Sequence, residues 1–267
     1  DEKEVPEIFD ENPERFKQEP YRRKLLIILQ RLRNNLKQIK TRIDNKEINQ
    51  GCAYPNEQAF LQDLYLIHDS LISQGDEIVA NGALQDLIRL VETFGFYLAH
   101  LDIRQESTIH SSTVAEILQQ IDGTDYNRLD ESARLELLAN KIAHNTPPTI
   151  NTDALVELSQ ETLEIFNVMV AMRDEISPKA FGTYVISMTH AASHIMEVMW
   201  LASLSGLVGK DENQAWFSHI VVSPLFETIE DLEHIEIVLK KLLNNSVYTG
   251  LLKSSGNLQE VMLGYSD

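Results

Sequence analysis

Three charged side chains lie at or near the ends of segments that read as strands. Arg104 lies in the stretch LDIRQEST (101–108), Glu227 closes PLFE (224–227), and Asp267 closes GYSD (264–267). The chemistry they offer is that of fixed charges at the carboxyl ends of parallel strands, where barrel enzymes keep their active sites. Arg104 alone is equally well explained as an ordinary strand residue. A functional role for Arg104 is favoured because the two carboxylates also lie at the ends of strand-like segments.

Strands and helices alternate from residue 96 onward, which predicts parallel β/α units. Four such units are half of a (β/α)8 barrel. The predicted fold class is therefore helix-rich α/β, a partial TIM-type barrel with about four parallel strands and an N-terminal helical segment. The strands are expected at 96–103, 184–188, 220–227 and 260–263, and helices at about 153–176, 192–205 and 229–244.

Two further segments between the first and second strands are read from local signals. Thr113 and Glu116 have the spacing of a capping box, so a helix is expected to start at Thr113. Residues 122–152 are mixed and polar and contain Pro147-Pro148, which predicts an excursion over the surface.

The N-terminal third reads differently. Residues 1–19 are acidic, contain two prolines and show no hydrophobic periodicity, which predicts an arm. After this arm, apolar periodicity predicts a helix that runs through Ile43 and two more helices over 56–74 and 82–93. We therefore predict an acidic arm with a helical segment over 1–94 and a partial barrel over 95–267. The chain starts without methionine and stops directly after a strand-like segment, so we expect a piece of a longer protein.

The first predicted helix is strongly two-faced. One face of this helix is an apolar stripe, and the other face holds 8 of the 23 lysines and arginines of the chain. This face could bind an anion or a partner, but a solvated face is the usual role of such charge, and we favour it. The apolar stripe consists of Leu25, Leu29, Leu32, Leu36, Ile39 and Ile43, and the basic face of Arg22, Arg23, Lys24, Arg31, Arg33, Lys37, Lys40 and Arg42.

Composition excludes several classes of protein. With 267 residues and 43% apolar residues, the chain can bury a substantial core. The net charge of −18 argues against general binding of nucleic acid, which needs a basic face. No apolar run is long enough to span a membrane, and no signal peptide is visible. The single cysteine, Cys52, excludes an internal disulfide framework and suits a cytoplasmic protein.

With these motifs in place, the chain resembles the middle part of phosphoenolpyruvate carboxylases. The likeness runs from EPYR (19–22) through ANG (80–82) to LDIRQEST, PLFET and GYSD, in the family's order. The resemblance implies a cytoplasmic, helix-rich enzyme built around a β/α barrel. It also implies a reaction that joins phosphoenolpyruvate and bicarbonate to give oxaloacetate and phosphate, with Mg²⁺ or Mn²⁺ as cofactor and a homotetramer as the usual assembly.

The resemblance assigns roles to three residues. Glu227 and Asp267 stand where the family has its two carboxylate ligands to the divalent metal, and Arg104 where it has an arginine that holds the substrate phosphate. These residue types suit the roles, because hard cations take carboxylate oxygens. A guanidinium matches the oxygens of a phosphate in a forked geometry.

The chain also departs from the family pattern. The catalytic-histidine motif, the loop rich in glycine and arginine, and the lysine after GYSD are absent. We therefore assign no catalytic residue within the chain and expect it to be inactive by itself. In addition, Ser193-His194 replaces the family's more frequent Ser-Asp, which suggests a subfamily variant.

Two histidines and two other functions stay open. His190 and His194 are four residues apart and could share a metal, but position 191 is alanine rather than a zinc protease's glutamate, so we favour capping or supporting roles. His100 and His110 are interpreted as packed or surface residues, and Asp102 and Glu106 as ion-pair partners of Arg104. The alternative functions are a non-catalytic helical scaffold and another metal-dependent barrel lyase or aldolase.

Overall fold

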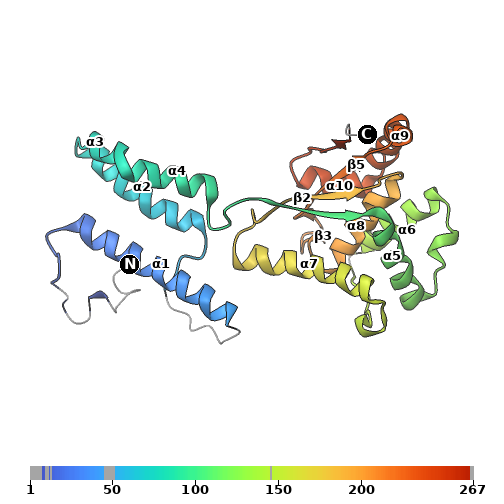
Figure 1. The fold of residues 1–267 in the computed structure, drawn as a ribbon, viewed down its shortest axis with the longest axis horizontal. Helices are drawn as coiled ribbons and strands as arrows, with labels where there is room; N and C mark the ends of the chain where they lie inside the picture. The colour runs from blue at the N-terminus through green and yellow to red at the C-terminus, as the bar shows by residue number, and fades with distance from the viewer. Residues whose placement is uncertain (1–7, 10–11, 13, 45–51, 145, 265–267) are drawn as a thin grey trace. The chain divides into compact units, whose positions relative to one another are not determined.

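The computed structural model describes residues 8–9, 12, 14–44, 52–144 and 146–264. The chain divides into two compact units, Asp1–Leu98 and Ala99–Asp267 (Figure 1). Each unit has hydrophobic clusters of its own. In the part of the chain that the structure describes, no helix has both the length and the apolar character that a membrane crossing requires.

The first unit is helical. It contains α1 (Pro20–Ile43), α2 (Glu57–Ser73), the short α3 (Glu77–Val79) and α4 (Gln85–Phe94), with a π-helical stretch over Ala80–Leu84 between the last two. The side chain of Asn56 caps α2 by accepting the N–H of Ala59. Asp63 lies on α2, where its carboxylate contacts Lys24 at 2.6 Å, Arg31 at 3.4 Å and the Tyr54 hydroxyl at 2.7 Å. These contacts tie α1 to α2.

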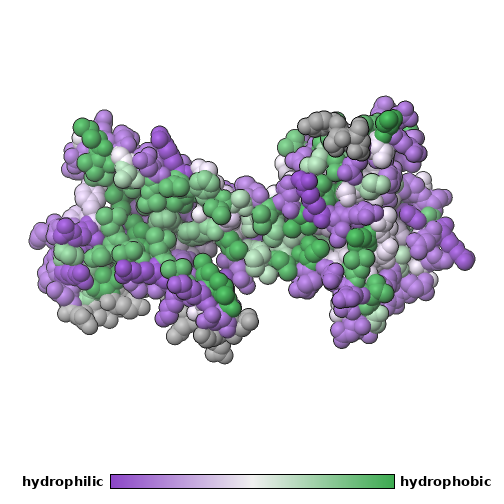
Figure 2. All heavy atoms as spheres, viewed as in Figure 1, coloured by the Kyte–Doolittle hydropathy of each residue, from purple (hydrophilic) through white to green (hydrophobic). Residues whose placement is uncertain are grey.

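The apolar stripe predicted on α1 is not the buried side of that helix. Within the described structure Ile27 and Ile28 are the buried residues of α1. Five residues of the stripe are instead between 42% and 76% exposed, namely Leu25, Leu29, Leu36, Ile39 and Ile43. Figure 2 shows further apolar side chains gathered on the visible face of this unit over α2 and α4.

The second unit carries a parallel sheet with the strand order β1-β2-β5-β6. The strands are β1 (Leu101–Glu106), β2 (Phe181–Ser187), β5 (Val221–Phe226) and the short β6 (Met262–Leu263). All three neighbouring pairs are parallel. The fold class is confirmed: the protein is a helix-rich α/β protein with four parallel strands, consistent with a partial barrel.

The described residues of the second unit also form the helices α5 (Ser107–Asp122), α6 (Glu131–His144), α7 (Glu157–Glu175), α8 (Ala192–Leu204), α9 (Ile229–Leu243) and α10 (Ser246–Ser254). Helix α5 packs against β1, and α8 and α9 pack against β5. Helix α8 is apolar around nearly its whole circumference and lies in the middle of the core. Met196, Met199 and Trp200 are buried there, as the sequence predicts.

The structure corrects two expectations about the segment between the first two strands. Helix α5 begins at Ser107, directly after β1, rather than at Thr113. The Thr113 hydroxyl donates to the Ile109 carbonyl at 2.9 Å inside the helix instead of capping it. Residues 122–152 are not only a surface excursion, because they contain α6, whose Leu138 and Ile142 are buried in the core.

Three further elements in the described residues of the second unit have no counterpart in the sequence-based expectation. A small antiparallel hairpin pairs β3 (Val208–Lys210) with β4 (Trp216–Ser218), and α10 closely follows α9. The side chain of Asn245 caps α10 by accepting the N–H groups of Val247 and Tyr248. Together the hairpin and α10 add to the cover of the core, in which Val208 and Leu251 are buried.

Candidate active site

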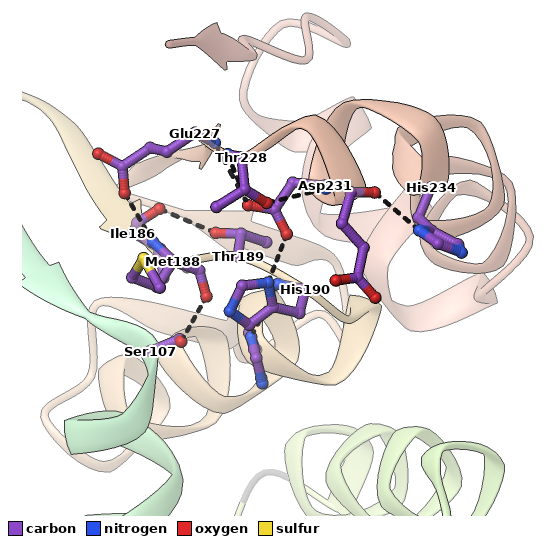
Figure 3. A network of polar contacts seen from close by, with 11 residues as sticks. Ser107, Ile186, Met188, Thr189, His190, Glu227, Thr228, Asp231 and His234 are labelled. Atoms are coloured by element: carbon purple, nitrogen blue, oxygen red, sulfur yellow. Dashed lines mark hydrogen bonds and ion pairs between the residues drawn. The ribbon is translucent and has the colours of Figure 1, made fainter. Parts of the chain in front are cut away.

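Glu227 follows the last residue of β5, and its carboxylate contacts the end of the neighbouring strand. One carboxylate oxygen, Oε2, accepts the backbone N–H of Met188 at 3.2 Å. The other oxygen points away from this network in Figure 3. Glu227 is half-buried. An oxygen that faces away from its protein partners leaves the carboxylate able to bind a cation as well.

Met188 has an unusual backbone conformation at the end of β2. Its φ is +54°, in the left-handed region that residues other than glycine rarely adopt. Its carbonyl accepts the hydroxyl of Ser107 at 2.6 Å. The next residue, Thr189, donates its N–H to the Leu225 carbonyl at 3.3 Å and its hydroxyl to the Ile186 carbonyl at 2.8 Å. Hydrogen bonds on both sides therefore hold this turn in place.

Asp231 fixes the turn that carries Glu227. It forms a capping box with Thr228 at the start of α9, and its Oδ2 also accepts the N–H of Glu227 at 3.4 Å and of Thr228 at 3.1 Å. Its Oδ1 contacts Nδ1 of His190 (Figure 3). Burial acts to raise the pKa of the Asp231 carboxyl, but hydrogen bonds from His190 and Thr228 outweigh burial and lower that pKa. Asp231 is therefore a charged acceptor at the end of β5.

His190 and His194 each have hydrogen-bonding partners within the protein. Nδ1 of His194 accepts the backbone N–H of His190 at 3.3 Å, and the two rings lie edge to face at 6.1 Å. Burial, followed by the charges of His190 and Arg134, lowers the pKa of His194 to about 4. His194 is thus a neutral acceptor near the start of α8, which agrees with the supporting role expected for it.

Arg104 lies on the face of the sheet opposite the helical core. Arg104 pairs in register with Val185 on β2, and Val185 pairs in turn with Ser223 on β5. Residues level with one another in parallel strands share a face, and the alternating residues Tyr184 and Val222 face the helical core. The Arg104 side chain is 62% exposed and lies 3.6 Å from the Asp102 carboxylate. Glu227 stands four residues beyond the register position of Ser223, further along the same sheet.

The other residues near the arginine motif have structural partners. The ion-pair role expected for Asp102 is confirmed. Glu106 instead accepts the Thr108 hydroxyl at 2.7 Å. His110 is fully buried, with Nε2 at 2.8 Å from the Tyr184 hydroxyl. This contact confirms the packed role expected for His110.

Asp267 lies outside the described residues, but the segment that leads to it lies beside Glu227. Strand β6 pairs with β5, and the N–H of Gly264 donates to the Phe226 carbonyl at 2.9 Å. A side chain at position 264 would place its Cβ only 3.1 Å from Cα of Glu227. The close approach of Asp267 to Glu227 stays a prediction.

The described residues offer part of a metal site. Glu227 supplies a carboxylate oxygen of the kind that Mg²⁺ and Mn²⁺ prefer. Within the described ranges, no group of three or more histidine, cysteine, aspartate or glutamate side chains is arranged to hold a metal ion. Glu227 therefore fits a cation of this kind as one ligand, and the remaining ligands would come from elsewhere.

A second buried carboxylate lies away from this edge, on α8. Glu197 is fully buried and accepts the hydroxyls of Ser111 and Tyr126, each at 2.8 Å. Burial raises the pKa of Glu197 to about 7, although the hydroxyls and the charge of Arg134 oppose the increase. This pKa exceeds the ordinary value of 4.5, so the folded protein binds the proton more tightly than the unfolded chain.

The protein is therefore expected to lose stability as the pH rises from 4.5 through about 7, because Glu197 must then be ionised in the core. The contribution of Glu197 is fully present below pH 4.5, and between pH 5 and pH 8 its loss amounts to roughly 2 kcal/mol. The Glu197→Gln variant should lose this component of the pH dependence. Thermal unfolding of both proteins at pH 5 and pH 8 measures it, and equal pH dependence in the two would contradict the expectation.

Comparison with known proteins places this geometry in context. The family model for phosphoenolpyruvate carboxylase matches residues 1–267. A phosphoenolpyruvate carboxylase of Prochlorococcus marinus (strain MIT 9301) is 36% identical, and the alignment covers 98% of this chain and 28% of the relative. One of Thermosynechococcus vestitus is 35% identical over 100% of this chain and 27% of its own length. The chain thus spans little more than a quarter of the length of these curated relatives.

Proposed function

Because this chain belongs to the phosphoenolpyruvate carboxylase family, we propose that it supplies part of the active site of an enzyme that carboxylates phosphoenolpyruvate with bicarbonate. The products of this reaction are oxaloacetate and phosphate. The observation that carries the proposal is the Glu227 carboxylate, fixed at the carboxyl end of β5 with one oxygen facing away from its protein partners. Strand ends of this kind are where barrel enzymes place their reacting groups.

In this proposal Glu227 and Asp267 are ligands to Mg²⁺ or Mn²⁺. The position of Gly264 against Glu227 supports the pairing, because Gly264 is three residues before Asp267 in the sequence. When bound, the cation supplies positive charge that stabilises the enolate formed as phosphate leaves. Glu227 contributes a fixed oxygen, whose position depends on Met188 and on the turn capped by Asp231.

Arg104 is proposed to hold the phosphate group of the substrate. Its guanidinium lies on the sheet face opposite the helical core, and the ion pair that the described residues give it is the long contact with Asp102 at 3.6 Å. The side chain is 62% exposed, so its forked donors stay accessible. We assign no proton-transfer residue to this chain. The division into an N-terminal helical segment over 1–94 and a barrel part over 95–267, the cytoplasmic location and the homotetramer belong to the same proposal.

The 267-residue chain by itself is expected to form no oxaloacetate. The described sheet has four strands, and the proposed site within the chain consists of one arginine and two metal ligands. Phosphoryl chemistry depends on several positioned charges acting together, so this set is too small. The measurement incubates the full-length protein and the chain alone with phosphoenolpyruvate, bicarbonate and Mg²⁺ and follows oxaloacetate.

Turnover that requires bicarbonate in the full-length protein would support the proposed function. A full-length protein without such turnover would favour a scaffold or a different lyase. Turnover by the chain alone above a blank that contains only metal would instead overturn the roles proposed for Arg104, Glu227 and Asp267, because the groups outside the chain would then be dispensable.

A further inference from the structure

We propose that Ser107 is a positioning residue for the Glu227 carboxylate and acts on it through the backbone of Met188. The inference rests on the proposed function, since it concerns how the metal ligand Glu227 is held. Ser107 is the first residue of α5, Met188 follows β2 and Glu227 follows β5. Three segments far apart in the sequence thus meet at the carboxyl ends of the strands (Figure 3).

The contacts form a continuous chain from the first strand to Glu227. The Ser107 hydroxyl donates to the Met188 carbonyl at 2.6 Å, and the Met188 N–H donates to Glu227 Oε2 at 3.2 Å. Ser107 is fully buried, so water does not compete for its hydroxyl. The bond from Ser107 fixes the peptide on one side of the Met188 Cα, and the N–H on the other side faces the carboxylate.

The backbone of Met188 needs such a restraint. Its φ of +54° lies in the left-handed region, which is strained for a residue other than glycine. A residue in this region persists where its surroundings hold it, and the bond from Ser107 is one of the contacts that do so. Without that bond the Met188 carbonyl would be left without its short partner, and the turn could relax toward an ordinary conformation. The N–H would then turn away from Glu227.

The Ser107 hydroxyl differs from those of Ser112 and Thr113 on the same helix. Ser112 donates to the Thr108 carbonyl at 2.8 Å and Thr113 to the Ile109 carbonyl at 2.9 Å, both four residues earlier in α5. Ser107 instead contacts a residue 81 positions away in the sequence. It also lies three residues after Arg104, so the same short segment carries the proposed phosphate ligand and the support for the proposed metal ligand.

The expected consequence concerns metal affinity. A ligand carboxylate that loses a charge-assisted hydrogen bond gains freedom to rotate, and loss of such supporting contacts costs roughly 10- to 100-fold in metal affinity. Ser107 acts on Glu227 only through Met188. The metal affinity of the Ser107→Ala variant is therefore expected to fall by the lower end of this range, about tenfold. Binding of Mn²⁺ to the full-length protein without substrate, followed by electron paramagnetic resonance, measures this effect independently of turnover.

Ser112→Ala is the matched control. It removes a hydroxyl from the same helix, but that hydroxyl donates within the helix, to the Thr108 carbonyl, rather than to Met188. We expect it to bind Mn²⁺ as the wild type does and to unfold at a similar temperature. A Ser107→Cys variant fills the site with a slightly larger side chain and a weaker donor, and it carries the same test if Ser107→Ala unfolds early.

A double-mutant cycle separates positioning from general damage to the fold. The Glu227→Asp variant retains a carboxylate on a shorter side chain, which moves it away from the Met188 N–H. If Ser107 acts through Glu227, its substitution should cost little further affinity in the Glu227→Asp background. If Ser107→Ala binds Mn²⁺ as tightly as the wild type, or if its cost is the same in both backgrounds, the positioning role is wrong.

The cycle also distinguishes this inference from the function on which it rests. Unchanged Mn²⁺ affinity in Glu227→Asp would remove the proposed metal role, and the positioning role with it. Weaker binding in Glu227→Asp together with wild-type binding in Ser107→Ala would remove the positioning role alone.

Discussion

Substitution of Glu227 by glutamine in the full-length protein is expected to lower kcat/KM for phosphoenolpyruvate by roughly a hundred- to a thousandfold. The amide keeps the shape of the side chain but removes the negative charge that a divalent cation requires. The Met188 N–H would also face a neutral oxygen in place of a carboxylate. Steady-state kinetics at fixed bicarbonate over a range of Mg²⁺ concentrations measure the loss, which should be accompanied by a higher metal requirement.

Glu230→Gln is the control for this substitution. Glu230 lies three residues further along, in the first turn of α9, and its side chain is exposed. It loses the same charge near the same helix terminus, and the effect of one exposed charge there is small. Comparable activity losses in the two variants would point to a general electrostatic effect and contradict a specific role for Glu227.

Arg104→Lys is expected to lower kcat/KM for phosphoenolpyruvate on the order of a hundredfold. Lysine retains the charge but replaces a planar fork by a point charge, so it cannot hold two phosphate oxygens in the same geometry. Initial rates at varied phosphoenolpyruvate and saturating bicarbonate measure the effect. The apparent affinity for bicarbonate should change much less.

An arginine away from the site provides the comparison. Arg128 is an exposed residue of the same unit and is paired with Asp125 at 2.9 Å, so Arg128→Lys should leave the kinetics unaltered. Wild-type kinetics in the Arg104→Lys variant would show that Arg104 serves mainly as the ion-pair partner of Asp102. The long contact of 3.6 Å between these two side chains makes that role a weak one.

Much of the second unit could be predicted from sequence because its signals are local. The strand β2 and the helices α7, α8 and α9 lie within a few residues of their predicted bounds. Each is a long apolar or periodic run, which is the most reliable signal. Helix α5 begins six residues before its predicted start, because the spacing of Thr113 and Glu116 suits a cap that the chain does not use.

Burial in the first unit could not be predicted in the same way. Periodicity shows that α1 has an apolar stripe, but it does not show what the stripe contacts. In the structure Ile27 and Ile28 are buried, whereas Ile43 is 76% exposed. Which side of a helix is buried depends on neighbours that are distant in the sequence, and periodicity carries no information about them.

In the candidate site, too, local motifs could be predicted from the sequence, whereas contacts between distant residues could not. Motifs are enough to single out Arg104 and Glu227, but the contact of Ser107 with Met188 spans 81 residues and has no local signature. The contact of His190 with Asp231 spans 41 residues and is equally hidden. One missed feature was readable, since Thr228 and Asp231 have capping-box spacing at the start of α9.

The glycine at position 264 has a consequence for how this protein can change over evolutionary time. Its missing side chain leaves room for the backbone of Glu227, where a methyl group would lie 3.1 Å from Cα. An alanine there would push one segment away from the other by a few tenths of an ångström. Two short motifs nearly forty residues apart are thus constrained by one shared volume, so a change in either is tolerated only when its neighbour accommodates it.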